Sequence, residues 1–185
     1  MEHTLVVLVE DKPGVLNRVA SLFRRRAFNI ESLTVGHTEQ PGTSRMTIVI
    51  NGDQTIVERV TANLYKLVNV LQVADLVEIP AVSRDLALIK VGVNATNRSE
   101  VMQLVEVFRS RIVDVANDSL IVEITGDEDK INSFVEVLRP FGILEMVRTG
   151  LVAMARGVSP ALTALNGYDN GASVPAELMV RQATD

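Results

Sequence analysis

An internal repeat is the feature that most limits the folds open to this sequence. Residues 22–30 resemble residues 107–115, and both stretches read as the end of a helix that runs into a strand. Residues 47–53 likewise resemble residues 120–127, where a Gly-Asp pair follows a strand and precedes a helix. Between these anchors the second copy is about eleven residues shorter, which a trimmed hairpin with its turn at 117–119 explains. We therefore expect two related domains.

Hydrophobic periodicity predicts the order of elements in the first copy. That order is strand, helix, strand, strand, helix, strand, with strands expected at residues 4–10, 30–36, 45–51 and 68–78. The first helix follows Asp11-Lys12-Pro13-Gly14, and the second follows Asp53, which is a suitable N-cap. The apolar face of the first helix is expected to consist of Val15, Leu16, Val19, Leu22 and Phe23. Pro41-Gly42 marks the tip of the hairpin.

This order is typical of a ferredoxin-like βαββαβ sandwich, an α+β fold in which two helices cover one face of an antiparallel sheet. The second copy is expected to begin with a strand at 85–93 and a helix at 99–108. The predicted division is a first domain at residues 1–78, a linker at 79–84, a second domain at 85–157 and a disordered tail at 158–185.

Composition excludes several classes of function. With 18 Lys+Arg against 23 Asp+Glu, the chain lacks the basic excess that neutralises a phosphate backbone, so nucleic acid is not expected as a partner. The absence of cysteine excludes disulfides and thiolate chemistry, and His3 and His37 alone do not predict a metal site. No export signal or membrane-length apolar run is found, so we expect a cytoplasmic protein. No nucleophile–base arrangement or nucleotide-binding glycine loop appears, and no catalytic residue is assigned.

The turn from Asp11 to Gly14 is the candidate functional feature. The first turn of a helix leaves backbone N–H groups without intrahelical partners and carries the positive end of the dipole, so a carboxylate can bind there. Gly14 allows close approach to the backbone, and Val15 and Leu16 offer apolar contact. Local spacing by itself favours a structural interpretation, in which Pro13-Gly14 only starts the helix and Asp11 caps it.

Other parts of the sequence favour a ligand site at this turn over a purely structural helix start. The turn resembles the Asp/Asn-x-x-Gly-x-Leu helix start of ACT domains, small modules that bind amino acids in many biosynthetic regulators. Further blocks resemble the small regulatory subunit of acetolactate synthase, also called acetohydroxyacid synthase, and lie at residues 24–35, 44–48, 66–71 and 109–115. The resemblance extends over roughly residues 1–157, and it is specific because the blocks occur in order.

This resemblance implies a non-catalytic chain that partners a large catalytic subunit. Thiamine diphosphate, Mg and FAD would belong to that subunit, which condenses pyruvate with pyruvate or 2-oxobutyrate, and this chain would carry no cofactor. The chain would activate the catalytic subunit in valine, leucine and isoleucine biosynthesis. It would also confer feedback inhibition by valine or a related branched-chain amino acid.

The resemblance also implies where the amino-acid effector binds. Two N-terminal ACT domains would pair edge to edge in a homodimer, with the effector at their interface. One chain would contribute Asp11, Gly14, Val15 and Leu16, and the other would contribute Asn29 and Ile30. Helix-start amides suit the effector carboxylate, and an Asn side-chain carbonyl can accept a hydrogen bond from the ammonium group.

Two details qualify this implied site. Many members of the family carry Asn where this chain has Asp11, so the carboxylate here affects the affinity for the effector and its identity. In the second copy, residues 94–99 lack the Pro-Gly element, and at most weak effector binding is expected there.

Two other functions remain as alternatives. A stand-alone ACT-type amino-acid sensor could act on another enzyme or on transcription, although no helix-turn-helix or basic arm is found. An independent enzyme on this fold would need convergent catalytic groups, and none are visible in the sequence.

Overall fold

The first domain is built around a central strand that is buried on both faces of its sheet. The computed structural model describes residues 1–157, and the predicted tail at 158–185 lies outside the described residues. The elements of the domain are β1 (Glu2–Glu10), α1 (Val15–Arg25), β2 (Ser32–His37), β3 (Thr43–Asn51), α2 (Gln54–Leu64) and β4 (Val70–Asp75). All pairings are antiparallel, in the order β2-β3-β1-β4, which places β1 inside the sheet.

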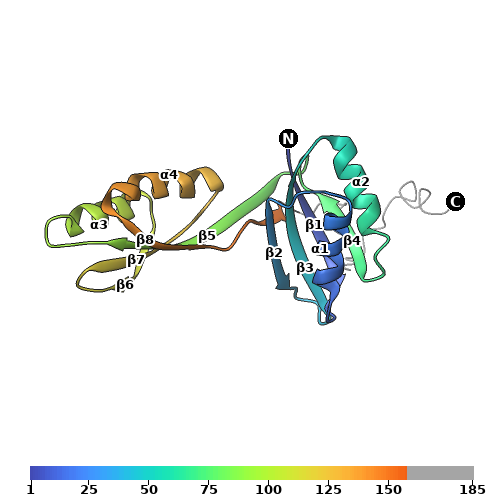
Figure 1. The fold of residues 1–185 in the computed structure, drawn as a ribbon, viewed down its shortest axis with the longest axis horizontal. Helices are drawn as coiled ribbons and strands as arrows, with labels where there is room; N and C mark the ends of the chain where they lie inside the picture. The colour runs from blue at the N-terminus through green and yellow to red at the C-terminus, as the bar shows by residue number, and fades with distance from the viewer. Residues whose placement is uncertain (158–185) are drawn as a thin grey trace.

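Helices α1 and α2 lie side by side over one face of this sheet (Figure 1). Successive side chains of a strand point to opposite faces, so alternate residues of β1 and β3 meet the helices. This core contains Leu5, Val7, Val9, Met46, Ile48 and Ile50 from the strands and Val19, Phe23, Val57 and Val60 from the helices. The expected βαββαβ order is confirmed for the first copy.

The second domain repeats this architecture. Its elements are β5 (Ala81–Gly92), α3 (Arg98–Val107), β6 (Arg111–Val115), β7 (Ser119–Gly126), α4 (Glu128–Leu138), a 3-10 helix (Arg139–Phe141) and β8 (Ile143–Arg148). The strand order β6-β7-β5-β8 corresponds position by position to that of the first sheet. The turn between β6 and β7 is shorter than that between β2 and β3, as the repeat predicts. The α+β ferredoxin-like fold class is confirmed for both copies.

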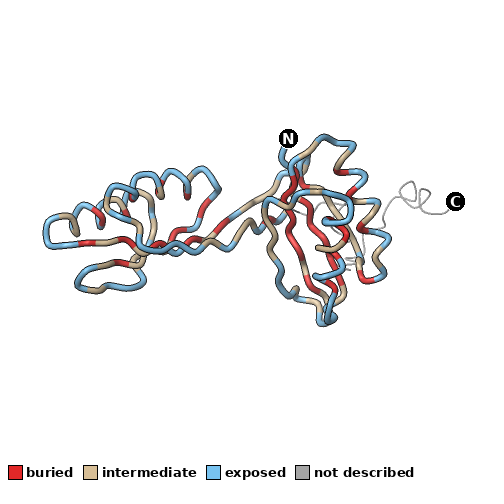
Figure 2. Tube along the Cα trace, in the orientation of Figure 1, coloured by how far each residue is buried: buried red, intermediate tan, exposed pale blue. Residues whose placement is uncertain are grey.

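A ninth strand, β9 (Val152–Ala155), was not expected from the sequence. It pairs with the first residues of β5, from Ala81↔Ala155 to Arg84↔Val152. The resulting two-stranded ribbon covers the face of the first sheet that the helices leave open, where Val6, Leu76 and Ala153 form a third buried cluster. Figure 2 shows the central strands of the first sheet as buried along most of their length, which follows from this double cover.

Several strand ends differ from the sequence expectation. The fourth strand is shorter than residues 68–78, because turns flank it: the Val70 amide donates to Leu67 O at 3.0 Å, and the Ile79 amide donates to Leu76 O at 3.1 Å. β5 starts at Ala81 rather than at residue 85, since β9 supplies a partner for its first residues.

The predicted cap of α2 is confirmed, because the Asp53 side chain accepts the Ile56 amide at 2.9 Å. Asp127 caps α4 in the same way through the Lys130 amide, also at 2.9 Å. None of the helices within residues 1–157 combines the length and apolar character needed to span a membrane.

Candidate functional site

The loop between β1 and α1 is held in an unusual backbone conformation by Gly14. This residue is the N-cap of α1 with φ +83° and ψ −2°, in the left-handed region that residues with a side chain rarely adopt. Among residues 1–157 no side chain caps the helix, so the expectation that Asp11 caps it is wrong. Asp11 turns instead toward the β2–β3 hairpin: its amide donates to Gly42 O at 2.8 Å, and its carboxylate lies 3.4 Å from His37 Nδ1.

Because no side chain caps α1, its first turn presents free backbone donors. The Val15 amide reaches back to Lys12 O at 3.3 Å, and the Arg18 amide makes the first full helical bond, to Gly14 O at 3.0 Å. Within residues 1–157, the intervening amides of Leu16 and Asn17 have no hydrogen-bond partner. A helix start of this kind attracts a carboxylate, because the free N–H groups and the positive end of the helix dipole both face the space in front of the helix.

Of the two apolar residues at this helix start, one is buried and the other is exposed to solvent. Val15 is 4% exposed and belongs to the core, whereas Leu16 is 44% exposed, so its predicted place on the buried face is wrong. A helix turns by about 100° per residue, and the residue after a buried one faces partly outward. Leu16 therefore offers apolar surface beside the free amides.

A polar network below the loop fixes its position, and the sequence interpretation did not include it. Asn69, which is 7% exposed, donates from Nδ2 to Glu10 Oε2 at 2.5 Å and accepts from the Arg18 guanidinium at Oδ1. Its carbonyl also accepts the Glu10 amide at 2.9 Å. The hydrogen bonds from Asn69 and then from Lys12 hold the pKa of Glu10 below its ordinary value. One signal was available, an amide side chain set between Val68 and Val70.

Asn29 and Ile30 lie beyond the opposite end of α1. The helix is 11 residues long, and at a rise of about 1.5 Å per residue it separates Gly14 from its far end by roughly 16 Å. Asn29 is exposed and donates to Glu31 Oε1 at 2.6 Å, while Ile30 packs partly against the core. A single chain therefore does not bring the two groups of predicted site residues together.

The corresponding loop of the second domain is closed by its own side chains. Asn94 Oδ1 accepts the amides of Thr96 and Asn97 at 2.9 and 3.1 Å, and Asn97 Oδ1 accepts the Asn94 amide at 2.7 Å. These donors are satisfied internally, unlike those that follow Gly14. Residues 1–157 also hold no group of three or more His, Asp or Glu side chains placed to bind a metal ion.

Comparison with known proteins gives matches over both domains. A family model described as the AHAS small subunit-like ACT domain matches residues 5–72, and one described as the small subunit of acetolactate synthase matches residues 84–157. The probable acetolactate synthase small subunit of Archaeoglobus fulgidus is 55% identical over 157 residues, which cover 85% of this chain and 98% of that protein. The acetolactate synthase small subunit of Mycobacterium leprae is 54% identical over 155 residues, covering 84% and 92%.

A solved structure gives the same result at the level of the fold. The crystal structure of the acetolactate synthase small subunit from Thermotoga maritima superposes with a TM-score of 0.80 at 44% identity. The superposition covers 86% of this chain and 99% of that one, so both domains are included.

Proposed function

Because the chain belongs to the family of acetolactate synthase small subunits, we propose that it activates a catalytic acetolactate synthase subunit and makes it sensitive to valine or a related branched-chain amino acid. The observation that carries the proposal is the helix start behind Gly14, where the amides of Leu16 and Asn17 are free within the described chain. The effector carboxylate would accept from these amides, and its aliphatic side chain would contact the exposed surface of Leu16.

The remaining half of the site would come from a second copy of the chain. β2 is an edge strand of the first sheet, and Asn29 is exposed shortly before it begins. At the other edge, the Tyr65 hydroxyl accepts the Val73 amide at 3.0 Å and donates to Val73 O at 3.2 Å, which occupies the edge of β4. These features favour pairing through β2, with Asn29 and Ile30 of the second copy directed toward the effector.

Calorimetry with valine, leucine and isoleucine tests this site. Gly14→Asp places a carboxylate beside the free amides, so we expect binding to weaken by at least about tenfold through charge repulsion. Gly142→Asp is the matched control, because Gly142 also has a positive φ and open space where a Cβ would lie, but it belongs to the second domain. Equal binding by Gly14→Asp and the wild type would place the site elsewhere.

Reconstitution tests the regulatory role itself. Purified chain is mixed with its catalytic subunit, and acetolactate formation is measured while valine is titrated. We expect higher activity than that of the catalytic subunit alone, together with inhibition by valine. Activity and valine sensitivity that the added chain does not change would contradict the proposal.

A further inference from the structure

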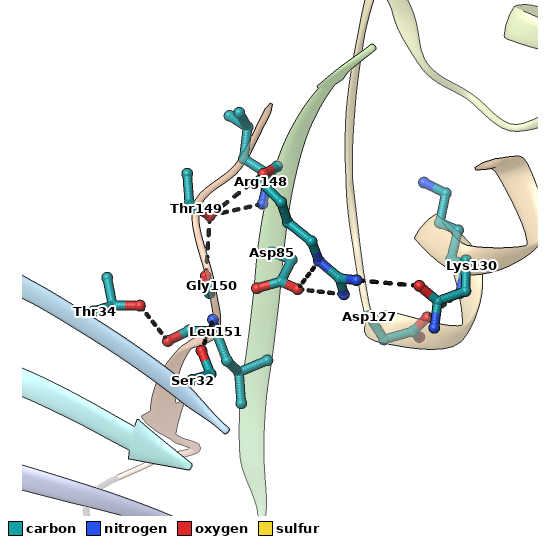
Figure 3. Close-up of polar contacts among 11 residues, drawn as sticks. Ser32, Thr34, Asp85, Asp127, Lys130, Arg148, Thr149, Gly150 and Leu151 are labelled. Atoms are coloured by element: carbon teal, nitrogen blue, oxygen red, sulfur yellow. Dashed lines mark hydrogen bonds and ion pairs between the residues drawn. The ribbon is translucent and has the colours of Figure 1, made fainter. Parts of the chain in front are cut away.

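A short segment after β8 ties the second domain to the first sheet. We call residues 149–153 the clasp. The Leu151 amide donates to Ser32 Oγ at 3.0 Å, and Thr34 Oγ1 donates to Leu151 O at 2.9 Å, so one residue bonds twice to β2 (Figure 3). These contacts lie on the sheet face opposite α1 and α2, since Leu33 between them packs against the helical core.

The fit of the clasp against β2 depends on a glycine. Gly150 has φ +88°, and a Cβ added to it would lie 2.8 Å from Ser32 Oγ and 3.3 Å from Thr34 Oγ1. Further along, the guanidinium of the half-buried Arg45 donates to Ala153 O at 2.6 Å. The clasp is thus held by side chains of both β2 and β3 and approaches too closely for a larger residue at position 150.

The other end of the clasp is fixed to the second domain. Thr149 exchanges hydrogen bonds with Leu86 of β5, with its amide donating at 3.0 Å and its hydroxyl accepting at 3.2 Å. The preceding residue, Arg148, donates to the buried Asp85 at 2.6 Å (Figure 3), and it also donates to Asn132 of α4 at 3.1 Å. Hydrogen bonds at Leu151, Thr149 and Arg148, joined by the backbone of residues 148–151, therefore connect β2 to helix α4.

We propose that the clasp transmits effector binding from the first domain to the second by engaging or releasing β2. This inference rests on the proposed function, because Asn29 and Ile30 stand directly before β2. Ser32 is three residues beyond Asn29, and between them the Glu31 amide donates to Val49 O of β3 at 2.9 Å, so the backbone that leads from residue 29 to the clasp is anchored to the sheet. The engaged and released clasp form a two-state element that the effector biases toward engagement.

The double variant Ser32→Ala/Thr34→Val tests the clasp, with Thr125→Val as a matched control on an exposed strand position of the second domain. In the complex with the catalytic subunit, we expect the valine concentration for half inhibition to rise about tenfold or more in the double variant only. By reciprocity, calorimetry on the isolated chain should also give a weaker valine Kd for the double variant than for wild type, because an effector that favours engagement binds the released clasp less tightly. A concentration for half inhibition and a Kd that both stay at the wild-type values would overturn the proposal.

Hydrogen exchange of the wild-type chain gives a readout independent of any variant and of activity. We expect valine to slow exchange in the peptide 148–155 severalfold, and not in the double variant. If valine binds by calorimetry but leaves this exchange unchanged, the clasp does not transmit effector binding, and the proposed function is unaffected by that result. No binding of valine, leucine or isoleucine by the wild type would instead overturn both.

Discussion

The backbone conformation at position 14 is what makes a glycine necessary there. No atom of residues 1–157 lies within 4 Å of the position that a Cβ would take, so the requirement for glycine comes from φ +83° rather than from crowding. Gly14→Ala should therefore lower the free energy of unfolding by about 1 kcal/mol. Gly36→Ala is the control, since that glycine is equally open but has no positive φ. Urea unfolding followed by circular dichroism measures the free energy of unfolding of both variants. Equal values would show that a side chain at position 14 does not strain the backbone.

Glu10 makes the loop sensitive to pH. Its folded pKa is lowered by the Asn69 and Lys12 hydrogen bonds from an unfolded value of 4.5, so the stability it contributes is present above that value and is lost as the pH falls through the folded pKa. Asn69→Ala should raise the Glu10 pKa, and the stability difference between variant and wild type should shrink from pH 7 to pH 3. Carboxyl NMR titration measures this directly. Glu136, whose pKa Arg139 lowers, is the internal control and should not change.

Residue-scale predictions from the sequence succeeded where the deciding contact is local. Asp53 meets an amide three residues away, so spacing alone identifies the cap. Asp11 failed because Gly14 takes the N-cap position, and the contacts of Asp11 are with Gly42 and His37 on another hairpin. Asn69 was missed for the same reason, since its partner Glu10 lies 59 residues away.

At the scale of elements, the two edges of the first sheet differ. The β4 edge is occupied at Val73 by the Tyr65 hydroxyl, whereas β2 carries the clasp on one face and leaves its outer edge as the end of the sheet. A free edge pairs readily with another strand, so this difference selects the edge through which two copies can join.

Tyr65→Phe should open the β4 edge. The ring is retained, but the amide and carbonyl of Val73 lose their partner, which should cost about 1 kcal/mol. Hydrogen exchange at the Val73 amide should become faster, while the amides of β7 in the second domain serve as the internal control. Unchanged protection of Val73 would mean that the hydroxyl does not seal this edge.

Periodicity predicted the six elements of the first domain and the first two of the second, because each carries enough alternating or helical pattern to be read locally, and the internal repeat implied the rest of the second domain. β9 escaped because it spans four residues between Gly150 and Gly157, and its partner on β5 lies about 70 residues earlier. The small residues Ala153 and Ala155 of β9 pack against the first sheet, and this packing cannot be inferred from the sequence around them.

At the scale of the whole molecule, the junction between the domains contains a buried ion pair. The Asp85 and Arg148 side chains are 6% and 26% exposed, and Asp85 Oδ1 has no partner among the described residues. The sequence could not predict this junction, because the bonds of Leu151 to β2 join residues more than 100 positions apart.

Arg148→Met should lower the free energy of unfolding by about 3 kcal/mol, because it leaves the Asp85 carboxylate buried without a counter-charge. The double variant Asp85→Asn/Arg148→Met should recover part of that loss, since no charge stays buried. Arg111→Met is the control: Arg111 is 77% exposed beside Glu123, and breaking an exposed pair costs about 1 kcal/mol or less. Urea unfolding of all three variants provides the measurement, and equal losses for Arg148→Met and Arg111→Met would contradict this account.

β5 belongs to two layers at once, because its first residues lie in the ribbon on the first sheet and its later residues form the middle of the second sheet. A strand of 12 residues is about 40 Å long. It therefore acts as a lever arm: a tilt of about 10° where it rests on the first domain would carry its far end through about 7 Å. A small movement at the amino-acid site of the first domain would in this way displace the second domain by several ångströms, which is enough to change its contacts with another subunit.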